Sequence, residues 1–199
     1  MPSRRPIRRP TATLAQTPLP VTPYPSRDLW RLHETGMGAV HFMLHPAHRF
    51  SHPACPFPVL YLAEDLATCI WERFGDDILN EGSPVSLGLW RSRSASRVRV
   101  PDLRLCDLTD ARTATRAKVD LGALTSHDLA IPIEWGLRIQ EHPAAFDGLR
   151  YRSRFNHEPC IVLFNRDGMA SRLHATPVGN LPDIPEADDF LRHHHVALI

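Results

Sequence analysis

The sequence predicts a single α+β domain, in which short strands and helices mix around one hydrophobic core. Residues 59–63 (VLYLA) and 160–164 (CIVLF) are compact apolar runs typical of buried strands. Residues 65–75 and 130–142 carry apolar side chains at helical spacing, and the intervening segments show no regular strand–helix–strand alternation. A chain of 199 residues is long enough to bury one such core.

The chain divides into an arm and a folded domain. Residues 1–27 are expected to form a disordered N-terminal arm, because the first 26 residues contain seven prolines, several arginines and no acidic residue. Residues 28–199 are expected to fold as one domain. It begins near Asp28 with the apolar run at 29–32 and continues through an irregular, His-rich stretch at 36–58.

The later elements follow from local signals. Glu64 and Asp65 favour a helix start directly after the strand at 59–63, and Gly75 is expected to end that helix. A polar helix is expected at 111–120. An Asp147–Gly148 turn leads into a strand at 149–152. Three further short strands are expected at residues 85–91, 97–100 and 104–108.

Composition excludes several classes of protein. The net charge of +1 gives no electrostatic reason to expect direct nucleic-acid binding. No apolar run is long enough for a membrane span, and no apolar segment of a secretory signal follows the basic start. The four cysteines are scattered, as in a reduced cytoplasmic protein. We therefore expect a cytoplasmic protein without a membrane anchor.

Five polar side chains lie at the edges of apolar elements and are candidates for a site. Arg31 lies inside the apolar run Leu29–Leu32, so it must meet an anion or extend to water. Tyr61 is either a core tyrosine or a ring that stacks on a planar ligand. Arg49 is a surface arginine unless the fold turns it inward.

Glu72 and Ser153 can each be read either as a structural residue or as part of a site. Glu72 lies off the apolar stripe of its predicted helix but among bulky neighbours, so it is either solvated or held in a cleft. Ser153 follows a strand, where a hydroxyl often caps the local backbone.

Histidines crowd the segment from His33 to His52, and three of them have helical spacing. That spacing could hold a metal, but Pro46 interrupts the helix and no acid or cysteine lies among the three. We expect no metal, and we keep a metal-dependent hydrolase as an alternative. A nucleic-acid-binding module that uses the arginine arm is a further alternative.

Taken together, these segments resemble the RES domain family, which is named for a characteristic Arg, Glu and Ser. FPVLYLAEDLATCIWERFGD resembles the family's strand-to-helix block and carries Tyr61, Thr68 and Glu72. FDGLRYRSRFNHEPCIVLFNR resembles its turn-and-strand block and carries Ser153. Arg31 and Arg49 match two arginines that precede the tyrosine strand.

The resemblance implies a fold similar to that of ADP-ribosyltransferases and an enzyme that degrades NAD, which makes residues 28–199 an NAD-binding catalytic domain. Several members cleave NAD by phosphorolysis, with inorganic phosphate as co-substrate. Hydrolysis of NAD is the other expected route. The family's usual partner is a helix-turn-helix (Xre-type) antitoxin that covers the active site. A protein mono-ADP-ribosyltransferase on the same fold is the alternative.

The same resemblance assigns the site residues. Arg31, Glu72 and Ser153 are the expected catalytic residues, and Arg49 and Tyr61 are expected to bind NAD. The chain also departs from the family pattern at Trp71, where a small residue is usual, and at Arg152, where proline is usual. Leu32 replaces a common aromatic. These departures bear on the shape of the pocket.

Overall fold

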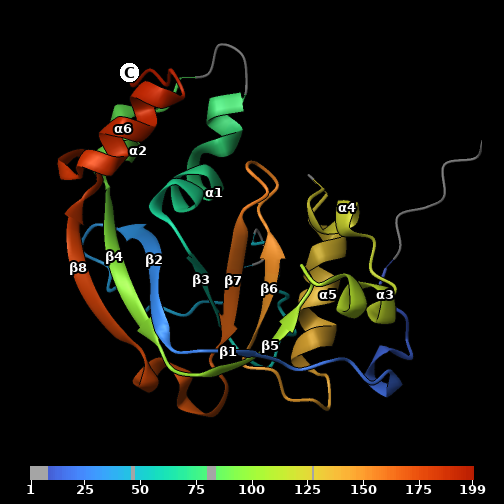
Figure 1. Cartoon of the computed structure of the whole chain (residues 1–199). Coiled ribbons are helices and arrows are strands. Elements are labelled where there is room, and N and C mark those ends of the chain that lie inside the picture. Colours follow the sequence, from blue (N-terminus) through green and yellow to red (C-terminus); the bar gives the residue numbers. More distant parts are fainter. Residues whose placement is uncertain (1–8, 46–47, 80–83, 127) are drawn as a thin grey trace, which may run out of the picture.

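The computed structural model describes residues 9–45, 48–79, 84–126 and 128–199 (Figure 1). It is a mixed α+β fold built on one eight-stranded sheet with strand order β1-β5-β6-β7-β3-β2-β4-β8. Neighbouring strands are antiparallel except for β5 and β6, which are parallel. The strands are β1 (Thr22–Tyr24), β2 (Arg27–Glu34), β3 (Val59–Ala63), β4 (Arg93–Val100), β5 (Leu103–Asp107), β6 (Gly148–Arg152), β7 (Pro159–Phe164) and β8 (His174–Asn180).

The helices lie in two groups at different ends of the sheet. One group contacts β2, β3 and β4 and consists of α1 (Leu66–Leu79), α2 (Leu87–Arg91) and α6 (Pro185–His193) (Figure 1). The other lies beside β5 and β6 and consists of α3 (Ala111–Ala117), α4 (Leu121–Leu124) and α5 (Ala130–Gln140) (Figure 1). None of the helices in the described ranges has the length and apolarity of a membrane span.

The centre of the sheet is formed by β3 and β7, the two apolar runs from which the fold was predicted. They pair from Val59↔Phe164 to Ala63↔Cys160. Both strands are nearly all buried because helices or loops cover the two faces of this part of the sheet. The apolar stripe of α1, with Leu66, Ile70 and Phe74, packs with α2 and α6 in a separate cluster.

Part of the expected disordered arm is packed on the core, which corrects the prediction for residues 9–27. Leu14 and Tyr24 are 1% and 6% exposed, and β1 pairs with the edge of the sheet at β5. An edge strand tolerates Pro23, whose missing N–H would interrupt a central ladder. Residues 1–8 of the expected arm lie outside the described residues.

Two other predicted boundaries were wrong. Residues 87–91 form helix α2 rather than a strand, because the Ser86 hydroxyl accepts a hydrogen bond from the Leu89 N–H and caps the helix. Helix α1 continues past Gly75 to Leu79. A Cβ at Gly75 would lie 2.4 Å from the Phe155 ring, so this glycine permits close packing inside the helix rather than ending it.

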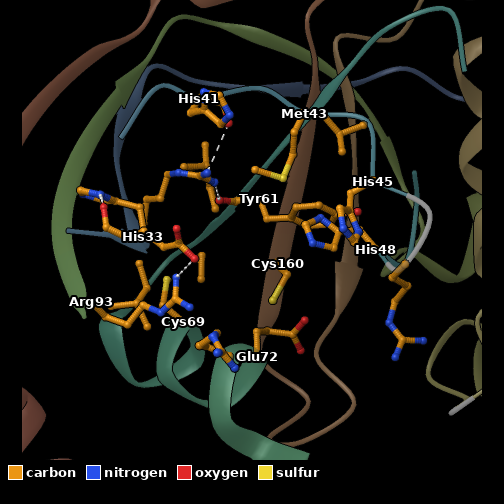
Figure 2. Close-up of a pocket in the computed structure, with 18 of the residues that line it drawn as sticks. His33, His41, Met43, His45, His48, Tyr61, Cys69, Glu72, Arg93 and Cys160 are labelled. Carbon is orange, nitrogen blue, oxygen red and sulfur yellow. Dashed lines mark hydrogen bonds and ion pairs between the residues drawn. The ribbon is translucent and has the colours of Figure 1, made fainter. Parts of the chain in front are cut away.

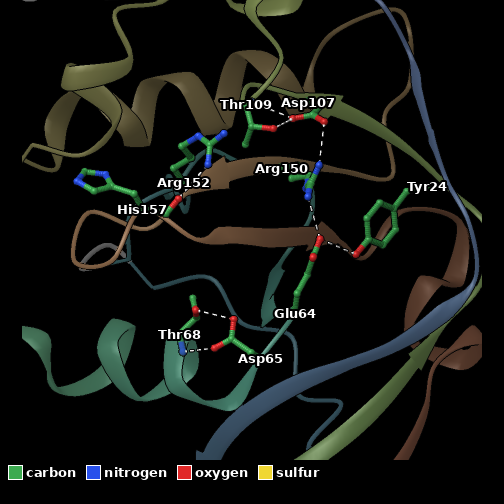
Figure 3. A network of polar contacts seen from close by, with 9 residues as sticks. All are labelled: Tyr24, Glu64, Asp65, Thr68, Asp107, Thr109, Arg150, Arg152 and His157. Atoms are coloured by element: carbon green, nitrogen blue, oxygen red, sulfur yellow. Dashed lines mark hydrogen bonds and ion pairs between the residues drawn. The ribbon is translucent and has the colours of Figure 1, made fainter. Parts of the chain in front are cut away.

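A polar network ties β1, β5 and β6 to the end of β3 (Figure 3). Arg150 donates to Glu64 at 2.9 Å and to Asp107 at 3.4 Å, and the Tyr24 hydroxyl donates to Glu64. Arg150 alternates with Tyr151 along β6, so the two side chains leave opposite faces of the sheet. The network therefore stabilises the sheet from the face opposite the site described next.

Candidate functional site

A cavity of about 750 Å³ opens between helix α1, strands β2 and β3, and the segment that follows β2 (Figure 2). Four of the five predicted site residues line it: Arg31, Arg49, Tyr61 and Glu72. Ser153 does not line the cavity. Its side chain is fully buried and contacts Glu72 on the side away from the cavity.

The Glu72 carboxylate is held by one hydroxyl at each oxygen. Ser153 Oγ donates to Oε1 at 2.6 Å, and the Tyr151 hydroxyl donates to Oε2 at 3.3 Å. Burial and the nearby Glu72 charge raise the pKa of Tyr151 well above its usual range, so this phenol keeps its proton. The carboxylate is thereby oriented while its side chain stays accessible from the cavity.

Sequence signals at the start of α1 explain how Glu72 reaches Ser153. Asp65 accepts hydrogen bonds from the backbone N–H and the hydroxyl of Thr68 at 2.7 and 2.9 Å, which caps the helix (Figure 3). Asn156 then donates to the Thr68 hydroxyl at 2.9 Å. This contact fixes the turn after β6 against α1 and sets Ser153 opposite Glu72.

Arg31 is a half-buried cation that has no carboxylate partner among the described residues. It donates to the carbonyl oxygens of Tyr61 at 2.9 Å and His41 at 3.3 Å (Figure 2). Burial lowers its pKa to about 10, so it remains charged at neutral pH. Because a partly desolvated charge without a counter-ion is unfavourable, an anion that enters the cavity would gain a strong partner here.

Arg49 joins the cavity to the segment between α4 and α5. It donates to the carbonyl oxygens of Leu124 at 2.6 Å and Ser126 at 2.9 Å. Burial lowers its pKa from the ordinary value. Of the residues predicted from the sequence, the cavity thus brings together two arginines on different segments and one carboxylate.

Tyr61 and His48 form an aromatic wall of the cavity (Figure 2). Their rings meet edge to face, with centroids 5.7 Å apart. The Tyr61 hydroxyl accepts a hydrogen bond from the Phe50 N–H at 3.1 Å. Burial, with His45 and Arg31 nearby, lowers the pKa of His48, so its imidazole is neutral at pH 7.

The His-rich segment contributes walls rather than a ligand set. His33, His41, His45 and His48 all line the cavity. Across the described ranges, no three His, Cys, Asp or Glu side chains gather closely enough to hold a metal ion. The metal-dependent hydrolase alternative therefore has no ligand cluster in this part of the chain.

The departures at Trp71 and Arg152 face away from the cavity. Trp71 stacks on Phe155 at 6.2 Å and meets Phe190 of α6 edge to face at 5.4 Å. Its bulk therefore helps to dock the C-terminal helix on α1. Arg152 is exposed and donates to the carbonyl oxygen of His157.

Sequence reasoning missed Tyr151 and three arginines that line the cavity. Tyr151 lies two positions before Ser153, and residues two apart leave the same face of a strand, so that spacing could have found it. Arg73, Arg93 and Arg154 look like ordinary surface arginines in the sequence. Only the folded chain shows that they share the cavity with Glu72.

The chain belongs to the RES domain family, whose model matches residues 28–184. Its fold is similar to that of a chain in the crystal structure of the M. tuberculosis MbcT-MbcA toxin-antitoxin complex, with a TM-score of 0.62 and 13% sequence identity. That match covers 94% of this chain and 99% of the other. No match is found among curated proteins.

Proposed function

We propose that this chain is an NAD-degrading enzyme that cleaves the bond between nicotinamide and ribose. The observation that carries the proposal is the Glu72 carboxylate, which Ser153 and Tyr151 hold at the wall of a cavity. The same cavity contains Arg31, a cation with no carboxylate partner in the described ranges. Membership of the RES domain family supports NAD as the substrate, as the sequence resemblance implied.

The proposed chemistry follows from the charges that develop on the substrate. When the glycosidic bond breaks, its electron pair leaves with the nicotinamide nitrogen and positive charge develops on the ribose. A fixed carboxylate stabilises that charge, so Glu72 would lie against the ribose and hydrogen-bond to its hydroxyls. An oxygen of water or of inorganic phosphate then bonds to the ribose carbon, and its proton passes to the solvent.

The arginines and the aromatic wall would bind the rest of the molecule. Arg31 and Arg49 would bind the diphosphate or an attacking phosphate through charge-assisted hydrogen bonds. Tyr61 would pack against nicotinamide, and the neutral His48 beside it would not repel the pyridinium charge. Ser153 would act through Glu72 rather than by touching the substrate.

The biological role we propose is the toxin of a toxin–antitoxin pair. The fold similarity to a chain of the MbcT-MbcA complex supports a partner that binds this protein. The partner would be a helix-turn-helix antitoxin that covers the mouth of the cavity. Co-purification with the product of an adjacent small reading frame, and loss of NAD cleavage in that complex, would test this role.

The deciding experiment is incubation of the purified protein with NAD, with and without inorganic phosphate, followed by chromatography and mass spectrometry. Nicotinamide with ADP-ribose 1″-phosphate, formed only when phosphate is present, would identify a phosphorylase. Nicotinamide with ADP-ribose in either buffer would identify a hydrolase. Label transferred from NAD to a protein of a cell extract would identify the ADP-ribosyltransferase alternative, and intact NAD in every arm would refute the proposed function.

A further inference from the structure

A second pair of arginines, Arg73 and Arg93, lines the same cavity. Arg73 follows Glu72 on α1, and Arg93 is the first residue of β4. In Figure 2, Arg93 and His48 lie on opposite sides of the cavity, and Glu72 lies between them at one wall. A ligand that spans the cavity from the aromatic wall past Glu72 therefore ends near Arg93 (Figure 2), and Arg73 is close enough to Arg93 for their charges to interact.

The positive charge of this pair is only partly matched within the protein. Arg73 is half-buried, and it forms no hydrogen bond or ion pair with any residue in the described ranges. Burial and the neighbouring charge of Arg93 lower its pKa. Two guanidinium groups thus repel each other in a half-buried place, which an anion would relieve.

Arg93 has a partner that a ligand can replace. Its Nη1 lies 3.1 Å from Glu34, but the Arg93 side chain is 13% exposed whereas that of Glu34 is 56% exposed. The Nε of Arg93 is buried and has no hydrogen-bond partner in the described chain. An ion pair with an exposed carboxylate is weak, so a ligand phosphate can replace Glu34 as the partner of Arg93.

Two neighbouring guanidinium groups suit a phosphate dianion, because each presents a planar fork of N–H donors. In a nicotinamide dinucleotide whose nicotinamide lies on the aromatic wall and whose glycosidic bond lies at Glu72, the adenosine end lies farthest from that wall. NADP differs from NAD by a phosphate on the ribose of that adenosine.

We propose that Arg73 and Arg93 form a second phosphate site, which binds the 2′-phosphate of NADP, and that the enzyme cleaves NADP as well as NAD. This inference rests on the proposed function, because it takes the glycosidic bond to lie at Glu72. Cleavage of NADP breaks the same nicotinamide–ribose bond and leaves the 2′-phosphate in place.

The test compares kcat/KM for NADP and NAD in the wild type and in three variants. Arg73→Gln and Arg93→Gln each remove one guanidinium and should lower the NADP-to-NAD ratio by about tenfold or more, as loss of a charge-assisted contact does. Glu34→Gln frees Arg93 from its competitor and should raise the ratio. Arg112→Gln, at an exposed arginine of α3 outside the cavity, is the matched control and should leave the ratio unchanged.

A binding experiment separates failure of this inference from failure of the proposed function. Calorimetry should show that 2′,5′-ADP binds the wild type at least about tenfold more tightly than 5′-AMP, and that Arg73→Gln removes the difference. If NAD is cleaved but NADP is not, or if the arginine variants lose both activities equally, the second site is refuted while the proposed function stands. If NAD is not cleaved, the proposed function fails, and equal binding of the two nucleotides would refute the site as well.

Discussion

Replacement of Ser153 by alanine tests whether this residue acts through Glu72. The change removes the 2.6 Å hydrogen bond to Glu72 Oε1 and the acceptor of the Phe155 N–H at 3.2 Å. A hydrogen bond to a charged group contributes about 1.5–3 kcal/mol, so the free energy of unfolding should fall by about that amount. If the same orientation is needed in the transition state, kcat should fall about 10- to 100-fold.

A double-mutant cycle with Glu72→Ala isolates the contact. In the Glu72→Ala background the carboxylate is absent, so Ser153→Ala should cost only the Phe155 contact, about 1 kcal/mol or less. Urea unfolding of the four proteins gives the coupling energy. Ser171→Ala is the control, because that exposed hydroxyl bonds only the Gly168 carbonyl within the described chain, and its effect should stay within about 0.5 kcal/mol. Additive costs of the two changes would refute the reasoning and would mean that Ser153 acts independently of Glu72.

Three other changes test the packing and electrostatics around the site. Gly75→Ala drives a methyl into the Phe155 ring and should lower the free energy of unfolding by about 1–3 kcal/mol, whereas Gly88→Ala, with its nearest contact at 3.6 Å, should be neutral or stabilising; urea unfolding measures both. Tyr61→Phe leaves the Phe50 N–H without its acceptor and should lower the melting temperature, with a cost of about 1–3 kcal/mol. The pKa of His48 in the folded protein is below 6.5, so the unfolded chain binds a proton more readily than the folded one. The free energy of unfolding should therefore fall as the pH drops below about 6.5, by at most about 1.4 kcal/mol per pH unit. His48→Gln should flatten that slope in urea titrations at several pH values.

The contradicting results are specific to each change. Equal stability of the Gly75→Ala and Gly88→Ala variants would mean that the turn after β6 does not press on α1 as described. An unchanged melting temperature for Tyr61→Phe would mean that the hydrogen bond between the Phe50 N–H and the Tyr61 hydroxyl does not stabilise the fold. An identical pH slope in wild type and His48→Gln would assign the loss of stability at low pH to other groups.

The elements that the sequence predicted correctly are those whose signals are local. The apolar runs that became β3 and β7 and the helical periodicity of α1 and α5 survive in the structure because burial acts on consecutive residues. Strand β8 has no such signal, since nearly all its residues are exposed and it is extended only because it pairs with β4. Leu14 and Tyr24 are isolated among prolines, so their burial depends on a surface formed elsewhere in the chain.

The candidate site divides in the same way. The resemblance to the RES family brought Glu72 and Tyr61 to attention, and the structure places both in one cavity. The burial of Ser153 behind Glu72 depends on how the turn after β6 packs on α1, which no local pattern encodes. Arg73 and Arg93 become candidates for a binding site only in the folded structure, where α1 and β4 bring them to the same cavity.

The most direct test of the account is nicotinamide release from NAD by wild type and Glu72→Gln, with the melting temperatures of both proteins measured alongside. The amide keeps the size of the side chain but removes the charge that would stabilise the developing cation. We expect that wild type releases nicotinamide, and that Glu72→Gln is slower by about 100-fold or more while it melts within a few degrees of wild type. A folded Glu72→Gln protein that retains more than about a tenth of the wild-type rate would contradict the central role given to this carboxylate.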